Sequence, residues 1–133
     1  MRIEYIDHIV LTVADITRTC EFYERVLGME AVTFEEGGAA GRTALRFGRQ
    51  KINLHESGKE FEPKATRPTP GSADLCFIVT SELDEVITRL DTRGVAVVEG
   101  PVRRTGARGA IESVYLRDPD GNLIEIARYL DTP

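Results

Sequence analysis

The chain has 133 residues, of which 41% are hydrophobic and 29% charged, and its formal net charge is -5. This length is usual for one folded domain, and the composition is typical of a globular protein, which excludes a disordered or fibrous chain. Because the charge is negative overall, we expect neither nucleic acid nor an anionic membrane surface as a partner.

The sequence indicates no membrane span and no export signal. Every apolar run is much shorter than the roughly 18 residues that indicate a membrane helix. Residues 1–6 are too short and too acidic for a signal peptide. We therefore expect a cytoplasmic protein. Cys20 and Cys76 lack CxxC spacing, so we expect reduced, buried thiols.

The first half of the chain predicts a strand, a helix and three further strands. Residues 7–13 alternate between apolar and polar side chains, as in a strand that is covered on one face. Asp15 is a suitable N-cap for a helix over 16–27, which ends before Gly28. The following strands are expected near 30–36, 42–48 and 51–56.

The second half repeats this order. Residues 74–79 alternate like the first strand, and a helix over 82–93 ends before Gly94. Three strands are expected to complete the half, near 95–99, 112–117 and 122–127.

The two halves share a register, which indicates a duplicated module rather than an array of short repeats. Val13 and Val79 are 66 positions apart. His55 and Glu125 are 70 positions apart, which a four-residue insertion in a loop at 101–111 would explain.

A segment with three prolines, residues 57–71, separates the halves. A long connection without secondary structure is unusual inside a compact domain and is often functional, so we expect it to lie over the surface near the functional site. The predicted layout is one domain made of module one, a linker and module two, at 1–56, 57–72 and 73–129.

Strand alternation assigns four chemistry-bearing side chains to one face. Successive side chains of a strand point to opposite sides, so His8 points away from the apolar residues of its strand. The same reasoning turns His55, Asp74 and Glu125 away from the packed positions of their strands.

These four side chains predict a metal site. The chain has two histidines, and both lie on this face opposite carboxylates, His8 with Asp74 and His55 with Glu125. Two imidazoles and a carboxylate suit one divalent ion of Fe, Mn, Ni, Co or Zn, with His8, His55 and Glu125 as the ligands. The simpler alternative is that each histidine bonds a strand neighbour and Glu125 is surface charge. The joint placement favours the metal.

Further candidates follow from the same alternation and from one loop. Tyr115 is predicted on the inward face, where it would bind substrate or donate a proton, or would only pack. Three arginines in the loop at 102–109 favour an anionic substrate, although solvated charge on a flexible hairpin explains them equally well. The candidate substrate-binding residues are Arg46, Asn53, Arg103, Arg104, Arg108 and Arg117.

Three segments of the chain resemble the vicinal oxygen chelate superfamily, which includes glyoxalase I, bleomycin resistance proteins and extradiol dioxygenases. The segments are 7–13, 22–29 and 115–125, and the last is the most specific, because Asp118-Pro119-Asp120-Gly121 forms a turn that delivers Glu125 on the returning strand. The resemblance implies an α+β fold of two paired βαβββ modules that form an open, cupped sheet with helices on the outer face. It places the metal ligands at His8, His55 and Glu125.

Within the superfamily, the segments at 52–56, 58–64, 70–72 and 100–102 resemble the glyoxalase-domain-containing protein five subgroup and its virulence-associated bacterial relatives. That subgroup name implies no defined reaction. Asp74 stands where several superfamily enzymes have a histidine, so it is a general base, a carboxylate that orients a histidine, or a fourth ligand.

The resemblance implies three alternative functions. The first is a metal-dependent lyase or isomerase that stabilises an enolate or similar oxyanion of a small oxygen-bearing substrate, with Asp74, Glu125 and Tyr115 as catalytic candidates. The second is an iron(II) extradiol catechol dioxygenase, and the third is a protein that binds a small molecule or drug without turnover. We favour an enzyme, and we expect a homodimer because a cupped sheet exposes strand edges.

Overall fold

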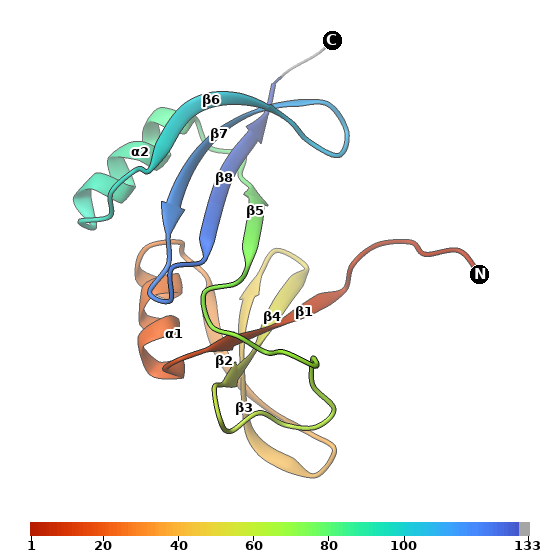
Figure 1. Ribbon diagram of the computed structural model, residues 1–133. Coiled ribbons are helices and arrows are strands. Elements are labelled where there is room, and N and C mark those ends of the chain that lie inside the picture. Colours follow the sequence, from red (N-terminus) through yellow and green to blue (C-terminus); the bar gives the residue numbers. More distant parts are fainter. Residues whose placement is uncertain (131–133) are drawn as a thin grey trace. The chain divides into compact units, whose positions relative to one another are not determined.

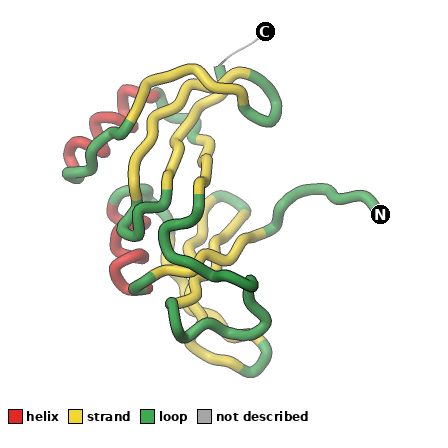
Figure 2. The backbone as a smooth tube through the Cα atoms, in the orientation of Figure 1, coloured by secondary structure: helices red, strands yellow, loops and turns green. Residues whose placement is uncertain are grey.

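The computed structural model describes residues 1–130 of the chain. Contacts divide the chain into two compact units, Met1–Pro70 and Gly71–Pro133, and each is described by itself as the first or second module (Figures 1 and 2). Both have the predicted βαβββ order, so the α+β fold class is confirmed. No helix within residues 1–130 is long and apolar enough to cross a membrane.

The first module is a four-stranded mixed sheet with one helix. Its elements are β1(His8–Val13), α1(Ile16–Arg25), β2(Glu30–Glu36), β3(Ala39–Phe47) and β4(Gln50–Glu56). The strand order is β1-β4-β3-β2, with β1 parallel to β4 and the other pairs antiparallel. Helix α1 contacts β2, β3 and β4.

The second module has the same plan. Its elements are β5(Asp74–Ile78), α2(Leu83–Thr92), β6(Glu99–Thr105), β7(Ala110–Arg117) and β8(Leu123–Tyr129). The strand order is β5-β8-β7-β6, again with one parallel pair, β5 and β8. Helix α2 contacts β7 and β8.

Each core lies between the helix and the apolar face of its sheet. In the first module the fully buried side chains include Val13, Tyr23, Leu45 and Leu54. Burial of each such side chain contributes about 1.5–3 kcal/mol from the hydrophobic effect. The opposite face of each sheet is therefore free to carry polar chemistry.

The predicted start of helix α1 is confirmed. Asp15 has extended backbone angles, and its Oδ1 accepts a hydrogen bond from the Arg18 amide at 3.0 Å. This bond satisfies one of the amides that lack a partner within the first turn of a helix.

Replacing Asp15 with alanine is expected to lower the free energy of unfolding by about 1 kcal/mol, because the Arg18 amide loses its acceptor. The measurement is urea denaturation followed by circular dichroism. Asp15→Asn keeps an equally good capping oxygen and is the matched control. Equal losses in the two variants would contradict a capping role.

Strand β6 differs from the prediction. Residues 95–98 are not strand, and most of the predicted loop at 101–111 belongs to β6 and the start of β7. In the sequence, Gly100-Pro101 is typical of a loop between elements. However, β6 is an edge strand, where a proline is tolerated. The register with β7 shifts between Glu99 and Val102 to accommodate these two residues.

The expectation of two buried thiols is wrong for both residues. Cys20 is partly exposed, and Cys76 is exposed on β5. Alternation had already turned Cys76 away from the packed positions of its strand, and that face of the sheet is not covered by α2.

The turn before β8 is held by two buried side chains. Asp118 Oδ1 accepts from the Asp120 and Asn122 amides at 2.9 Å each, and Asp118 Oδ2 accepts from Asn122 Nδ2 at 2.8 Å. Gly121 has a positive φ of 87°, as the sequence motif predicts. This turn fixes the register with which Glu125 returns along β8.

Candidate functional site

The polar face of the first module carries the predicted residues of that half. In the strand register, Val10 lies beside Asn53, and Asn53 lies beside Ala44. Because side chains alternate along a strand, His8 and His55 share the face of Asn53, and so does Arg46. The face assignments made from the sequence therefore hold in this module.

His8 is well placed to bind a ligand through one ring nitrogen. Its side chain is 42% exposed, and Nδ1 lies 2.8 Å from Asp7 Oδ2. The carboxylate can only accept, so Nδ1 carries the hydrogen and Nε2 is left with a free lone pair. Histidines that bind metals are commonly oriented by a carboxylate in this way.

His55 has a different environment. The residue is 3% exposed, and its Nε2 lies 3.3 Å from Arg42 Nη2, which donates to it. Arg42 is itself buried, with its guanidinium 4.3 Å from the centre of the Phe61 ring and 5.5 Å from that of Phe34. The Phe61 ring also meets the His55 ring edge-on, with 5.8 Å between centres.

The linker lies against His55 through the ring of Phe61. Burial lowers the pKa of His55, the Arg42 cation lowers it further, and Glu60 and Glu62 of the linker oppose these effects. A neutral His55 is therefore favoured in the folded chain.

The stability of metal-free protein is expected to fall as the pH is lowered through about 6.5, the ordinary pKa of histidine. The pKa of His55 is lower in the folded than in the unfolded chain, so the unfolded chain takes up the proton first. The slope reaches at most about 1.4 kcal/mol per pH unit. Denaturation at pH 7.5, 6.5 and 5.5 measures it, and His55→Asn is the control. An unchanged slope in His55→Asn would contradict this assignment.

The register separates His8 from His55. His8 lies beside Lys51, and His55 lies beside Thr12. Four positions along a parallel pair correspond to about 13 Å between their Cα atoms. An ion bound by both rings would have to lie between them.

The expected equivalence of His55 and Glu125 is wrong. Val10 lies beside Asn53, and Cys76, its counterpart 66 positions later, lies beside Glu125. Glu125 is therefore the counterpart of Asn53. The second module has extra residues both before β7 and in the turn before β8, so the offset is larger than the sequence comparison suggested.

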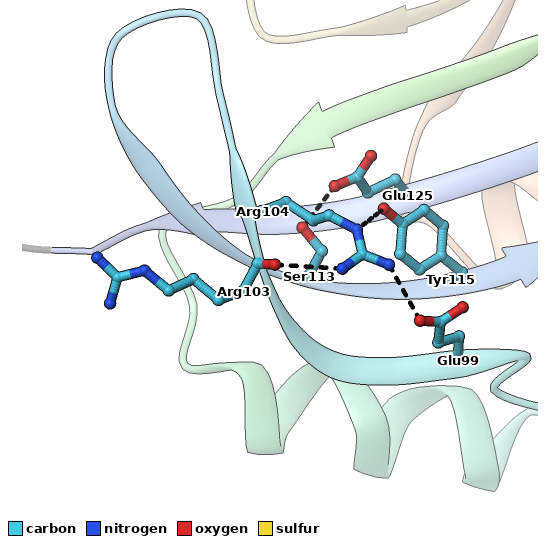
Figure 3. A network of polar contacts seen from close by, with 6 residues as sticks. All are labelled: Glu99, Arg103, Arg104, Ser113, Tyr115 and Glu125. Carbon is cyan, nitrogen blue, oxygen red and sulfur yellow. Dashed lines mark hydrogen bonds and ion pairs between the residues drawn. The ribbon is translucent and has the colours of Figure 1, made fainter.

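In the second module a row of side chains crosses all four strands. The register aligns Glu99 of β6 with Tyr115 of β7, Tyr115 with Glu125 of β8, and Glu125 with Cys76 of β5. Figure 3 shows Glu99, Tyr115 and Glu125 in this row, with Arg104 reaching toward Tyr115. Asp74 shares the face of Cys76, at the first position of β5.

Glu125 is held by two neighbouring donors and lies near a third. Ser113 Oγ donates to Glu125 Oε2 at 2.5 Å, and the Cys76 thiol also bonds to this carboxylate. The Tyr115 hydroxyl is close enough for the Glu125 charge to raise its pKa. Cys76 is exposed as a residue, but its thiol is partly shielded from water, and this partial desolvation and then the Glu125 charge raise its pKa to about 11. The thiol therefore keeps its hydrogen near neutral pH. Burial also raises the pKa of Tyr115, against the opposing effect of the hydrogen bond from Arg104.

Each guanidinium nitrogen of Arg104 donates one hydrogen bond to a partner within the module. Its Nε donates to the Tyr115 oxygen at 3.0 Å, Nη2 to Glu99 at 3.0 Å, and Nη1 to the Arg103 carbonyl at 3.2 Å. Because the Tyr115 oxygen accepts this bond, its own hydrogen remains available for Glu125.

The other predicted arginines also have partners within the chain. The Arg108 guanidinium lies 4.5 Å from the centre of the Tyr129 ring, and Arg117 Nη1 donates to the Gly121 carbonyl at 3.3 Å. Arg46 lies 3.8 Å from Glu30. Arg103 pairs with Glu112 in the register, on the opposite face from Arg104, and Figure 3 shows it pointing away from Glu125.

Sequence reasoning missed three residues of these arrangements. Arg42 could have been found, because a two-residue turn after Phe47 brings position 42 opposite His55. Ser113 follows from alternation with Tyr115, and Cys76 from its pairing with Glu125. Over residues 1–130, no group of three or more His, Cys, Asp or Glu side chains is arranged to hold a metal ion.

The family of the chain follows from comparison with known proteins. Residues 5–126 match the Glyoxalase/Bleomycin resistance protein/Dioxygenase superfamily, and the chain belongs to this superfamily. The resemblance in the sequence motifs is thereby confirmed.

Individual relatives cover nearly the whole chain. This chain is 59% identical over 130 residues to Virulence protein STM3117 of Salmonella typhimurium, and the match covers 98% of this chain and 88% of that protein. The crystal structure of STM3117 matches with a TM-score of 0.93, covering 98% of this chain and 100% of that one. Glyoxalase domain-containing protein RDO1 of Mycosarcoma maydis is 52% identical over 131 residues, covering 98% of this chain and 72% of RDO1.

A more distant relative has a named reaction. Lactoylglutathione lyase of Pseudomonas aeruginosa is 30% identical over 152 residues, covering 94% of this chain and 83% of that enzyme.

Proposed function

We propose that the chain is a divalent-metal-dependent enzyme of the glyoxalase type, a lyase or isomerase that acts on a small oxygen-bearing substrate. The observation that carries the proposal is Glu125, a carboxylate on a pocket wall that bonds to Ser113 and Cys76 and lies near Tyr115. Membership of the superfamily and the similarity to a lactoylglutathione lyase support this class of reaction.

The proposed metal ligands are His8, His55 and Glu125. His8 fits the role because Asp7 orients its ring and leaves Nε2 free. Glu125 fits because its donors fix one orientation of the carboxylate. His55 Nε2 accepts a hydrogen bond from Arg42, so metal binding would require that bond to break. Either Nε2 would then bind the ion, or Nε2 would take the ring hydrogen and Nδ1 would bind it. A bound divalent ion would supply Lewis-acid polarisation of the substrate oxygens.

Other residues would bind the substrate and move protons. Asp74 is proposed as a proton acceptor or as an orienting carboxylate, since it shares the face of Glu125. Tyr115 is proposed as a proton donor, because Arg104 occupies its oxygen and leaves its hydrogen free to transfer. Asn53 is 3% exposed, and its Oδ1 has no hydrogen-bond partner within residues 1–130, which supports a role in accepting a bond from substrate.

Metal analysis of protein purified without added metal or chelator tests the proposal. Nickel, zinc, cobalt or manganese near one ion per chain is the expected result. Iron at that ratio would favour extradiol ring cleavage instead. Protein that holds no metal and takes none up on titration would contradict the proposal and favour a small-molecule-binding protein.

We also propose that the protein is a homodimer. Strands β1 and β5 each lie at one end of their sheet, and such edges are commonly satisfied by pairing with a second copy of the chain. Light scattering that reports a monomer at micromolar concentration would contradict this assembly.

A further inference from the structure

A pocket of about 400 Å³ opens on the polar face of the second module. It is formed by β5, β8 and the β6–β7 hairpin, all within one module. The residues that matter for its chemistry are Cys76, Ile78, Arg104, Ile111, Glu125 and Tyr129. This volume lies within the range of small-molecule sites.

The charge of the one arginine on the pocket wall is matched by an acidic neighbour, and three of its five N–H donors are already used. Each nitrogen of Arg104 already donates, to Tyr115, to Glu99 and to the Arg103 carbonyl. Its charge is also matched by Glu99 at 3.0 Å. A carboxylate or phosphate that entered the pocket could bond only to the two remaining N–H groups, next to the Glu99 carboxylate.

The neighbouring arginines do not replace it. Arg103 points away from this face, and Arg108 lies against the Tyr129 ring without lining the pocket. The anionic substrate that the three arginines suggested in the sequence therefore finds no free cation here.

The carboxylate on the wall, in contrast, disfavours an anion and attracts a donor. Glu125 is the acidic residue that lines the pocket, and Asp74 lies on the same face nearby. A carboxylate oxygen accepts several hydrogen bonds, so another donor can be added to those from Ser113 and Cys76.

The remaining wall is apolar. Ile78, which is 49% exposed, and the ring of Tyr129 offer carbon surface, and Ile111 lines the pocket with only 3% of its surface exposed. Such a surface is stabilised by covering it with apolar or aromatic carbon.

From these three features we infer that the pocket takes an apolar or aromatic group bearing a hydrogen-bond donor, a hydroxyl or an amine directed at Glu125, and excludes carboxylates and phosphates. This inference rests on the proposed function in so far as it names the substrate class of the same site.

Three matched probes test the inference: 4-hydroxybenzyl alcohol, 4-hydroxybenzylamine and 4-hydroxybenzoate. Protein treated with EDTA is titrated with each probe and followed by amide NMR, so that the result does not depend on a metal. The alcohol or the amine is expected to shift the amides of pocket residues and to bind at least about ten-fold more tightly than the benzoate, because of repulsion by Glu125. Equal or tighter binding of the benzoate, or no binding by any probe, would overturn the inference.

Two variants separate the roles of the wall residues. Ile78→Arg adds a free cation at a half-exposed edge position and is expected to raise the affinity for the benzoate about ten-fold. Arg104→Met is expected to change that affinity less than about two-fold, because the Arg104 charge is already matched by Glu99. A large loss of benzoate binding in Arg104→Met would mean that Arg104 binds anions and would overturn the inference.

The outcomes remain distinct from those of the metal analysis. A protein without metal that still prefers the alcohol or the amine would contradict the proposed enzyme class alone. A metal-loaded protein whose metal-free form prefers the benzoate would contradict this inference alone.

Discussion

A His8→Ala variant is expected to retain less than about one tenth of the divalent metal that the unchanged chain holds, because loss of a protein ligand removes most of the binding free energy of a three-ligand site. The Glu125→Gln variant is expected to lose a similar fraction of the metal. The measurement is metal per chain by mass spectrometry after dialysis against a weak chelator.

Asp7→Ala provides the matched control for His8. It keeps the imidazole and removes only the carboxylate 2.8 Å from Nδ1. Loss of such an orienting group typically lowers metal affinity about 10–100-fold, so some metal should survive where His8→Ala keeps almost none. Full metal retention in the His8→Ala variant would exclude His8 as a metal ligand.

His55 is tested with a separate variant, because its hydrogen bond with Arg42 gives it a possible structural role in place of metal binding. If His55 is a ligand, His55→Gln loses metal as His8→Ala does. If it serves mainly to accept the hydrogen bond from buried Arg42, metal stays and only stability falls. The second result would reduce the ligand set to His8 and Glu125 with a further group still to be found.

Mixing the His8→Ala and Glu125→Gln variants asks which chain supplies each ligand. Recovery of metal in the mixture means that the ligands come from two copies of the chain, since an exchanged pair restores one intact set. Recovery would also require the proposed dimer. The control is the His8→Ala variant alone, carried through the same mixing procedure.

The parts of the fold that follow from local rules could be predicted from the sequence. Alternation assigns faces correctly for Asn53, Tyr115 and Glu125, because the period of two holds along any strand. Asp15 caps its helix, and Gly121 has the predicted positive φ, because both depend on a few neighbouring residues.

The register between strands could not be predicted as well. It depends on how many residues each connection contains, and the second module has additional residues around β6 that the sequence alone did not place. A shift of two positions keeps a side chain on its face but moves it along the strand by about 7 Å. Faces were therefore correct while the equivalence of His55 and Glu125 was wrong.

The charged residues show a second limit of the sequence. Composition indicates how many arginines a segment has but not which residues they contact. Here Arg104 donates hydrogen bonds to Glu99 and Tyr115. The buried Arg42 beside His55 is a contact between strands and depends on the same register.

The largest effect on stability is expected from Gly100→Ala, in the bulged part of β6. Gly100 has a φ of 109°, and a Cβ atom there would lie 2.4 Å from the Ser113 carbonyl oxygen and 3.0 Å from Val114 Cα. Both contacts are with backbone of β7, which cannot rotate away as a flexible side chain can. Backbone strain and overlap together should lower the free energy of unfolding by about 4 kcal/mol.

Gly121→Ala is the control that separates strain from overlap. Gly121 also has a positive φ, 87°, but a Cβ atom there would meet nothing within 4 Å. The control should therefore lose only about 1–2 kcal/mol, and urea denaturation measures both variants. Because Ser113 also donates to Glu125, the shift of β7 that Gly100→Ala forces should loosen the carboxylate and weaken metal binding, whereas Gly121→Ala should leave that contact in place. Equal losses of stability in the two variants would show that the close approach of β6 to β7 contributes nothing beyond the backbone angle.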